Sequence, residues 1–335
     1  MRQLLIGDCH FGKHSNSVTW LETQLKFFNT QFIEALETKN IDRVVFLGDL
    51  FDIRYSINQQ IGIEVKNFLK ETFEKYKNIE FFFISGNHDY YSPLEEFHAY
   101  NIYELLFSEE FVKYYPNSKF IVDEPLFDNG NLYLPWYYTE NFQKFSETFY
   151  SNNVNIENIF CHADLTGWDF SRTSLLRNAK VWSGHIHSIV EDKEQNLYNI
   201  GAMFSFDYND VNSTKYMYIL DGNNLIEKIE NITTPKFKRF FNEDIFTLTD
   251  KDFENSFVSL CIYSSNINKI KYIERLKEIK MKYDNVRKEV IDNNSGETVE
   301  LSYFNANIDQ YIESNIPEYL NDKYEKIKKI ISNKD

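Results

Sequence analysis

The sequence predicts an α/β fold in which a mainly parallel β-sheet is flanked by helices. Three β-rich runs, residues 3–6, 44–47 and 81–84, alternate with two stretches whose apolar residues recur at helical spacing. Alternation of strand and helix requires crossover connections, and these place the strands parallel to one another. The third run consists of aromatic and β-branched residues, which is typical of a strand buried on both faces.

Two helices are expected between these strands. The first follows a polar loop at residues 11–17, and Thr19 and Glu22 have the spacing of a capping box at its start. The apolar face of this first helix is formed by Leu21, Leu25, Phe28, Phe32 and Leu36. The second helix, which begins after Asp52, carries Ile61, Val65, Phe68 and Leu69. The order strand, helix, strand, helix, strand is therefore expected for the first part of the chain.

The later part of the chain divides into three regions. After an irregular stretch, strands are expected from Asn158 and Val181 and at residues 197–200 and 216–220. Beyond Gly222, strand-like and helix-like runs at residues 257–263, 270–279 and 286–291 predict a small α+β unit. The apolar stripes between Ile308 and Ile331 predict two short helices interrupted near Pro317. We therefore expect domains at residues 1–222, 223–298 and 299–335.

Composition limits the classes of function. A net charge of −15 argues against bulk electrostatic binding of nucleic acid, although bound divalent ions can supply local positive charge. Cys9, Cys161 and Cys261 have no CxxC spacing, so we expect reduced thiols and a cytoplasmic location. The first strand begins beside Met1 and leaves no room for a signal peptide, and no apolar run approaches the roughly 20 residues of a membrane span.

Five polar motifs follow five of the β-rich runs. In order they read GDCH (7–10), GDLFD (48–52), GNHD (86–89), CHAD (161–164) and GHIH (184–187). Because the carboxyl ends of parallel strands meet at one edge of a sheet, the motifs are expected to converge there. Their candidate metal-binding residues are Asp8, His10, Asp49, Asn87, His162, His185 and His187.

The chemistry of these residues predicts two divalent ions. A mixture of carboxylate, amide and imidazole donors suits Mn²⁺, Fe²⁺ or Zn²⁺ better than Ca²⁺, which prefers oxygen alone. Seven donors are too many for one ion and suit two ions that share a ligand. A single buried histidine is usually an ordinary core residue, but five of the seven histidines lie within the motifs. His14 and His98 lie outside them and are expected to have no such role.

The motif series resembles the signature of the calcineurin-like metallophosphoesterases: DxH, GDxxD, GNHD, a lone His and GHxH. Within that superfamily the chain is similar to SbcD-type recombination nucleases, particularly those encoded by T-even-like phages. This finer resemblance rests on GDLFD, on VWSGHIH followed by YNIGAMFSFD, and on PKFKRF at residues 235–240. It implies a β-sheet sandwich flanked by helices, a small α+β capping domain for DNA recognition, and C-terminal helices that bind an SbcC-type coiled-coil ATPase.

The resemblance also implies roles for individual residues. One ion would be held by Asp8, His10, His187 and a bridging Asp49, and the other by Asp49, Asn87, His162 and His185. His88 would stabilise the phosphate and help to protonate the leaving oxygen, with Asp52 orienting its ring. The candidates for DNA contact are Lys13, Arg54, Tyr55, Tyr90 and Tyr91.

The implied function is a manganese-dependent DNA nuclease, with double-strand 3′–5′ exonuclease and single-strand endonuclease activities. It would act in recombination and repair as a homodimer within a heterotetramer with the ATPase, in the host cytoplasm if the chain is encoded by a phage. One alternative is a phosphoesterase for small phosphodiesters or phosphoproteins, but phosphoprotein phosphatases place Arg after GDxxD and this chain has Ile53. The other is a non-catalytic scaffold, which should have lost ligands, whereas every motif here is complete.

Overall fold

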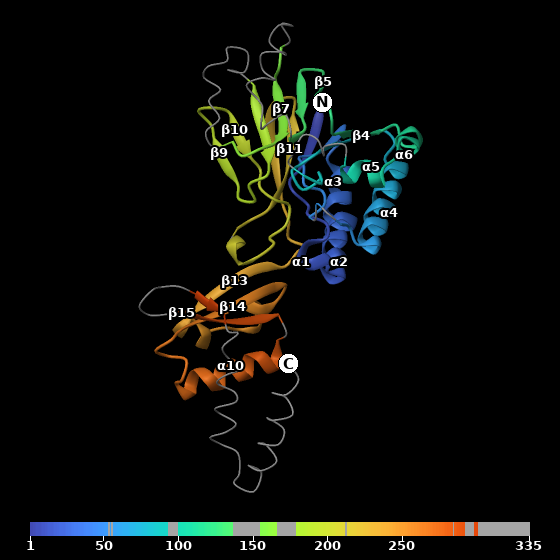
Figure 1. The fold of residues 1–335 in the computed structure, drawn as a ribbon. Helices are drawn as coiled ribbons and strands as arrows, with labels where there is room; N and C mark the ends of the chain where they lie inside the picture. The colour runs from blue at the N-terminus through green and yellow to red at the C-terminus, as the bar shows by residue number, and fades with distance from the viewer. Residues whose placement is uncertain are drawn as a thin grey trace. The chain divides into compact units, whose positions relative to one another are not determined.

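The computed structural model describes residues 1–52, 54, 56–92, 100–136, 155–165, 179–211, 213–283, 285–291 and 298–300. The chain divides into two compact units, Met1–Lys236 and Phe237–Asp335 (Figure 1). The first unit extends past the predicted boundary at Gly222, because β12 (Asn224–Glu230) pairs with β11 (Tyr216–Asp221). The helices predicted between Ile308 and Ile331 lie outside the described residues.

The first unit contains two six-stranded sheets. In spatial order the first sheet is β12, β11, β1 (Arg2–Ile6), β2 (Arg43–Phe46), β3 (Glu80–Ile84) and β4 (Ser118–Ile121). Strands β1 to β4 are parallel, whereas β11 is antiparallel to β1. The strands predicted at residues 3–6, 44–47, 81–84 and 216–220 are confirmed, as is the mainly parallel pairing.

The second sheet is built from the middle of the chain. In spatial order it contains β5 (Leu126–Asp128), β6 (Asn131–Leu134), β7 (Asn158–His162), β8 (Lys180–Gly184), β10 (Leu197–Asn199) and β9 (Val190–Asp192). The four inner strands are parallel, and each edge strand is antiparallel to its neighbour. Buried Leu5, Val45 and Phe82 of the first sheet share a core with Tyr133 and Trp182 of the second. The expected sandwich is therefore confirmed.

Aromatic residues join the helices to the first sheet. The predicted first helix is continuous but includes a π-helical turn: α2 (Val18–Phe27), η1 (Phe28–Phe32) and α3 (Ile33–Thr38). It is followed by α4 (Gln59–Lys75). Phe28 lies 6.4 Å from Phe46 on β2 and 5.3 Å from Phe68 on α4, measured between ring centroids. Burial of these large rings provides much of the hydrophobic stabilisation of this layer.

The start of the first helix differs from the prediction. Helix α2 begins at Val18, and its N-cap is Ser17, whose Oγ accepts a hydrogen bond of 3.3 Å from the Trp20 amide. The capping box proposed for Thr19 and Glu22 is therefore wrong, because Ser17 satisfies the helix terminus two residues earlier. The preceding residues form α1 (Lys13–Asn16), in which His14 and Ser15 have left-handed backbone angles.

The second unit has a separate core. Its sheet contains β13 (Lys236–Phe241), β14 (Ser256–Tyr263), β15 (Val286–Ile291) and β16 (Thr298–Glu300). Helix α10 (Ile270–Lys282) connects the parallel strands β14 and β15 and buries Tyr272, Leu276 and Ile279. The α+β character predicted for this region is confirmed. In the described parts of both units, no helix is long and apolar enough to cross a membrane.

Candidate metal centre

The five motifs converge where the two sheets of the first unit meet. The first three motifs follow β1, β2 and β3 of one sheet, and the last two lie at the ends of β7 and β8 of the other. Both sheets present the carboxyl ends of parallel strands at this edge, where α/β folds commonly place their sites. All seven predicted metal-binding residues lie here, and their donor atoms fall into two groups.

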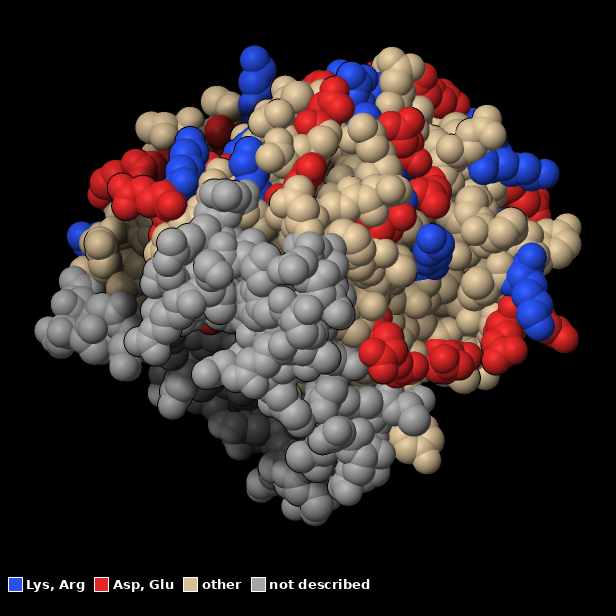
Figure 2. Space-filling model, turned by 90° about the horizontal axis from the view of Figure 1, so that it is seen from above, with Lys and Arg blue, Asp and Glu red and all other residues tan. Residues whose placement is uncertain are grey.

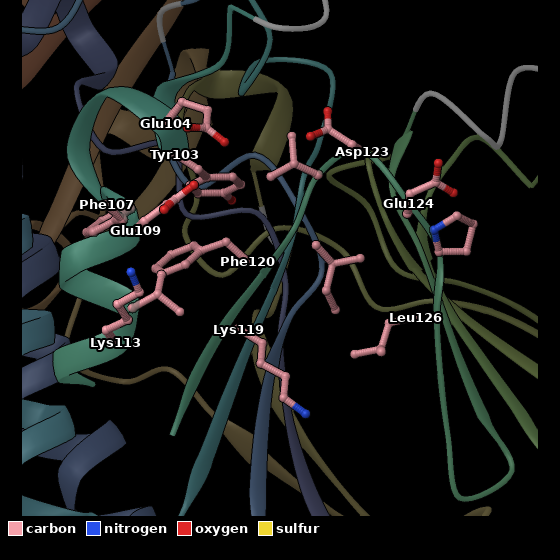
Figure 3. Close-up of a pocket in the computed structure, with 14 residues that line it drawn as sticks. Tyr103, Glu104, Phe107, Glu109, Lys113, Lys119, Phe120, Asp123, Glu124 and Leu126 are labelled. Carbon is pink, nitrogen blue, oxygen red and sulfur yellow. The ribbon is translucent and has the colours of Figure 1, made fainter. Parts of the chain in front are cut away.

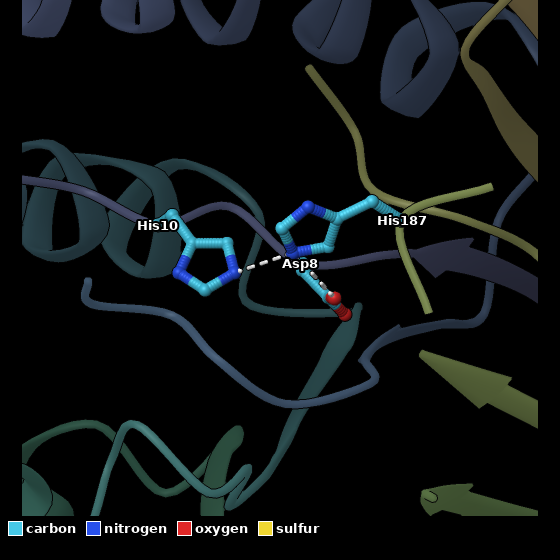
Figure 4. A group of neighbouring side chains, drawn as sticks. All are labelled: Asp8, His10 and His187. Carbon is cyan, nitrogen blue, oxygen red and sulfur yellow. Dashed lines mark hydrogen bonds and ion pairs between the residues drawn. The ribbon is translucent and has the colours of Figure 1, made fainter. Parts of the chain in front are cut away.

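The first donor group consists of Asp8, His10 and His187, together with Asp49. The Nε2 atoms of His10 and His187 are 3.1 Å apart, and His187 Nε2 lies 3.8 Å from Asp8 Oδ2 (Figure 4). His10 Nε2 also lies 3.6 Å from Asp49 Oδ2. Two imidazole nitrogens and two carboxylates therefore face one small volume.

The second donor group consists of Asn87, His162 and His185, again with Asp49. His162 Nε2 lies 2.9 Å from Asn87 Oδ1 and 3.3 Å from Asp49 Oδ2. His185 Nδ1 lies 3.0 Å from Asn87 Oδ1 and 3.2 Å from His162 Nε2. The same atom, Asp49 Oδ2, thus borders both groups.

These spacings fit divalent ions. Ligand atoms stand about 2.0–2.2 Å from zinc-sized ions, so neighbouring ligands of one ion are roughly 3.0–3.5 Å apart. The other ring nitrogens have partners of the kind that metal-bound histidines use. His162 Nδ1 contacts the Leu47 carbonyl at 2.7 Å, and His10 Nδ1 contacts Asp52 Oδ1 at 3.1 Å. If each Nδ1 carries the proton, each Nε2 presents its lone pair to the group.

Burial makes the charges of this cluster strongly interdependent. Burial raises the pKa of Asp8 to about 6, although nearby His162 opposes the shift. Burial would also raise the pKa of Asp49, but His162 and His10 outweigh it and hold that pKa well below its usual range. Burial would lower the pKa of His162, but Asp49 overcomes this and raises it to about 9. Carboxylates that are buried so close together are stabilised by added positive charge, which divalent ions supply.

Three of the motif residues have unusual backbone conformations. His10 and Asp49 each have φ of 48°, and His185 has φ of 81°. Left-handed angles are uncommon outside glycine and cost about 1–3 kcal/mol where surrounding structure enforces them. Hydrogen bonds between motifs provide that enforcement: the His10 amide donates to the Asp49 carbonyl at 2.9 Å, and the His185 amide donates to Asp8 Oδ1 at 3.1 Å.

Two motif glycines allow the close approach of the carboxylates. A Cβ atom at Gly86 would lie 2.2 Å from Asp49 Oδ1, and one at Gly184 would lie 2.2 Å from Asp8 Oδ1. These separations are far below van der Waals contact. A side chain at either position would therefore displace a predicted ligand.

His88 and Asp52 interact differently from the prediction. His88 Nδ1 lies 2.5 Å from the backbone carbonyl of Asp52, whereas the Asp52 carboxylate contacts His10 Nδ1 at 3.1 Å and Lys13 Nζ at 3.0 Å. The amide of Asp52 donates to the Phe11 carbonyl at 2.9 Å, which directs this residue toward the GDCH loop. The proposed pairing of the Asp52 carboxylate with His88 is therefore wrong, and the main chain of Asp52 takes that place.

The candidates for DNA contact differ in how much of each side chain reaches solvent. Tyr90 is buried, with 1% of its surface exposed, and its hydroxyl lies 2.7 Å from both Ser85 Oγ and the Val122 carbonyl. It is therefore a core residue and not a DNA contact. Tyr91 is 44% exposed, and Arg54 and Lys13 are partly exposed, so their roles stay predictions. Tyr55 lies outside the described residues.

Asp89 holds the GNHD loop in place; the sequence predicted a supporting or structural role for it and not a ligand or catalytic one. Its carboxylate accepts hydrogen bonds from the Gly86 amide at 2.8 Å and from the Tyr103 hydroxyl at 3.1 Å. Burial, reinforced by Asp49, raises its pKa to about 7. Its place as the last residue of GNHD was the only signal in the sequence, because Tyr103 belongs to a helix, α5 (Ile102–Leu106), that was not predicted.

A cavity of about 720 Å³ lies elsewhere in the first unit (Figure 3). It is lined by α5, α6 (Glu109–Tyr114), β4 and the residues leading to β5. Acidic Glu104, Glu109, Asp123 and Glu124 line part of it, together with the aromatic Phe120. None of the seven donors lines this cavity, so it is distinct from the candidate metal centre.

Comparison with known proteins agrees with this geometry. Residues 1–188 match the family model described as calcineurin-like phosphoesterase, and the chain belongs to this family of phosphoester-hydrolysing enzymes. The resemblance drawn from the motifs is confirmed. The chain is 26% identical over 330 residues to exonuclease subunit 1 of Enterobacteria phage T4, which covers 93% of this chain and 92% of that protein. It is also 40% identical over 93 residues to the SbcD component of the SbcCD nuclease of Staphylococcus epidermidis, covering 27% of this chain and 23% of that protein.

Proposed function

We propose that this protein is a manganese-dependent DNA nuclease and the nuclease subunit of a complex with an ATPase. The observation that carries the proposal is the pair of donor groups that share Asp49 Oδ2, at 3.6 Å from His10 Nε2 and 3.3 Å from His162 Nε2. A shared carboxylate between two nitrogen-rich groups is the arrangement that a two-metal phosphodiesterase requires. Similarity to a phage exonuclease subunit over nearly the whole chain supports DNA as the substrate.

The two donor groups would each hold one ion. The first ion would have Asp8, His10, His187 and Asp49 as ligands, and the second would have Asp49, Asn87, His162 and His185. When bound, two such ions supply an activated water and positive charge for the phosphate oxygens. The mixture of nitrogen and oxygen donors is compatible with Mn²⁺.

His88 would act on the substrate and not on the metals. Its Nδ1 is held by the Asp52 carbonyl, so Nε2 is the ring atom left to face the phosphate. Burial lowers the pKa of His88, although Asp49 opposes the shift. An anionic phosphate beside the ring favours the protonated form, in which Nε2 can donate a proton to the leaving oxygen.

The charge of the chain favours a partner that contributes to DNA binding. Lys and Arg are interspersed with Asp and Glu over the described part of the surface in Figure 2, and the whole chain carries −15. DNA binding depends on Lys and Arg at the phosphates. An ATPase of the SbcC type, bound through residues 299–335, would supply them in a heterotetramer built on a nuclease homodimer. Such a complex would act on DNA ends during recombination and repair in the cytoplasm.

The direct test is cleavage of end-labelled double-stranded and single-stranded DNA by the purified protein. We expect weak Mn²⁺-dependent cleavage that is poorly supported by Mg²⁺ and strongly stimulated by a cognate SbcC-type ATPase with ATP. His88→Asn should reduce the rate by about 100-fold or more while both ions still bind. His14→Asn is the matched control, because this exposed histidine packs on Trp20 and belongs to neither donor group.

The same assay, run with other phosphate esters, tests the alternative that the protein is a general phosphoesterase. If cyclic nucleotides or phosphopeptides are hydrolysed much faster than any DNA, with or without the partner, the protein is a general phosphoesterase. Loss of bound metal in His88→Asn would show that this residue is a ligand and that its role is misassigned.

A further inference from the structure

The loop that carries His185 and His187 is held by two residues outside the five metal-site motifs. Asn199, on β10, donates from Nδ2 to the carbonyl of Ile186 at 2.6 Å and to that of Ser188 at 2.7 Å. Lys215 donates from Nζ to the carbonyl between them, that of His187, at 2.9 Å. Three consecutive carbonyls of the loop are therefore held by two side chains.

Lys215, which holds the loop, also forms a buried ion pair with Asp210. Lys215 and Asp210 are 5% and 6% exposed, and Lys215 Nζ lies 2.6 Å from Asp210 Oδ1. The other oxygen of Asp210 accepts a hydrogen bond of 2.8 Å from the Phe206 amide. Burying a lysine is costly unless its charge is paired and its donors are used. Here Asp210 neutralises the ammonium, and the His187 carbonyl takes another of its donors.

His187 depends on this support more than the fully buried His10 and His162 do. Its side chain is 37% exposed, whereas those of His10 and His162 are 2% and 0% exposed. Packing around the ring therefore restricts His187 less, and the position of its backbone sets the position of Nε2. The neighbouring His185 has a left-handed backbone, which the loop must maintain at a cost.

We propose that Lys215 and Asn199 are positioning residues for His187, acting through the backbone of residues 186–188. They keep His187 Nε2 at 3.1 Å from His10 Nε2, so that both nitrogens can bind the first ion. This inference rests on the proposed two-metal function. Neither residue touches a donor atom of the groups, so their effect should appear as a weaker first ion and not as a lost chemical step.

The test is Mn²⁺ binding, measured by calorimetry and by electron paramagnetic resonance, on variants of the full chain. Lys215→Met combined with Asp210→Asn removes the ammonium without leaving a buried unpaired carboxylate. Asn199→Ala removes the other anchor and leaves the ion pair intact. In each variant we expect one of the two ions to bind about 10- to 100-fold more weakly, as seen when outer partners of metal ligands are removed. DNA cleavage should fall at low Mn²⁺ and recover at high Mn²⁺.

Two matched controls separate this role from a general contribution to folding. Lys180 donates from Nζ to the Asn223 carbonyl at 2.8 Å, at the opposite end of β8 from the GHIH loop. Asn117 donates from Nδ2 to three carbonyls, including that of Ile79 at 3.2 Å. Lys180→Met and Asn117→Ala should lower thermal stability by amounts similar to the test variants while leaving both Mn²⁺ affinities unchanged.

The outcomes distinguish failure of the inference from failure of the proposed function. If wild-type protein binds two ions and cleaves DNA while Asn199→Ala and the double variant retain both affinities, Lys215 and Asn199 have no positioning role. If the control variants weaken one ion to the same extent, the effect is one of stability and the inference is again overturned. If wild-type protein binds fewer than two ions, the two-metal function itself fails.

Discussion

Asp52 contacts three neighbours, two through its carboxylate and one through its backbone carbonyl. Its carboxylate contacts His10 Nδ1 and Lys13 Nζ, and its carbonyl contacts His88 Nδ1. Burial would raise the pKa of Asp52, but the bonds to His10 and Lys13 lower it to about 2. The carboxylate is therefore charged at neutral pH and can hold the proton of His10 on Nδ1. The Asp52 carboxylate should therefore affect catalysis through His10, a predicted metal ligand.

Replacement of the carboxylate tests this division of roles. Asp52→Asn should weaken binding of the first ion by about 10-fold or more, because His10 loses a charged partner. At saturating Mn²⁺ the cleavage rate should approach that of wild type, because the backbone carbonyl still holds His88. Metal titration and cleavage rates measured across a range of Mn²⁺ check both effects, with the exposed Asp42→Asn as control. A rate at saturating Mn²⁺ as low as that of His88→Asn would reinstate the carboxylate as the partner of His88.

Among the elements, Arg43 on β2 connects the two sheets at the edge opposite the motifs. Its guanidinium bonds Glu80 on β3 and lies 2.6 Å from both Asp128 Oδ2 on β5 and the Tyr133 hydroxyl on β6. It also lies 4.0 Å above the ring of Phe82. The Arg43 side chain is only 3% exposed, whereas Glu80 and Asp128 reach solvent. One buried cation thus ties together four strands from both layers.

Loss of this cation should destabilise the sandwich without altering the metal centre. Arg43→Met should lower the free energy of unfolding by about 2–3 kcal/mol, less than for a fully buried pair because both carboxylates keep access to water. Lys75→Met, which removes an exposed ion pair with Glu37, should have no measurable effect. Urea unfolding followed by tryptophan fluorescence provides the comparison. Equal free energies of unfolding for the two variants would mean that the contacts of Arg43 between the sheets do not stabilise the fold.

The central strands and the donors were predictable because each carries its own local signal. Residues 81–84 are apolar at every position, and the motif after them places Asn87 and His88 directly at the strand end. The short edge strands β5 and β9 have three residues each, and α5 has five, which is too short for a periodic pattern. Their existence depends on the neighbouring strands and helices.

The features that could not be predicted from the sequence depend on contacts between residues that are far apart in the chain. The burial of Tyr90 depends on Val122, and the partner of the Asp52 carboxylate is His10, far earlier in the chain. Lys215, the residue before β11, donates a hydrogen bond to the His187 carbonyl in the GHIH loop. The local sequence around either residue does not predict this contact. Such pairings become visible only when the fold is known, because no spacing rule links the residues.

At the scale of the whole molecule, charge is unevenly distributed along the chain. Residues 237–291 contain 11 Lys and Arg and 9 Asp and Glu, whereas the full chain has 36 against 51. The acidic excess therefore lies outside the described part of the second unit. The proposed DNA binding must use local positive charge or a partner, and residues 299–335 are the segment proposed to recruit that partner.

Truncation after Glu300 tests that proposal while keeping β16 complete. The shortened protein should bind both ions and cleave DNA at the basal rate, but it should no longer co-elute with the ATPase or be stimulated by it. In the full chain, Ile327→Asp on the predicted apolar stripe should act like the truncation, and Glu325→Ala beside it should not. Insoluble or unfolded truncated protein would instead show that these residues belong to the protein's own core.

The order of the motifs along the chain bears on how the protein is made. The first donor group is completed only by His187 and the second only by His185, although both groups include residues from the first 90 positions. A nascent chain that has not yet released residue 185 from the ribosome therefore lacks part of both groups. Prematurely terminated products that end before β8 would lack ligands of both proposed ions, so we expect them to have no activity as the proposed nuclease.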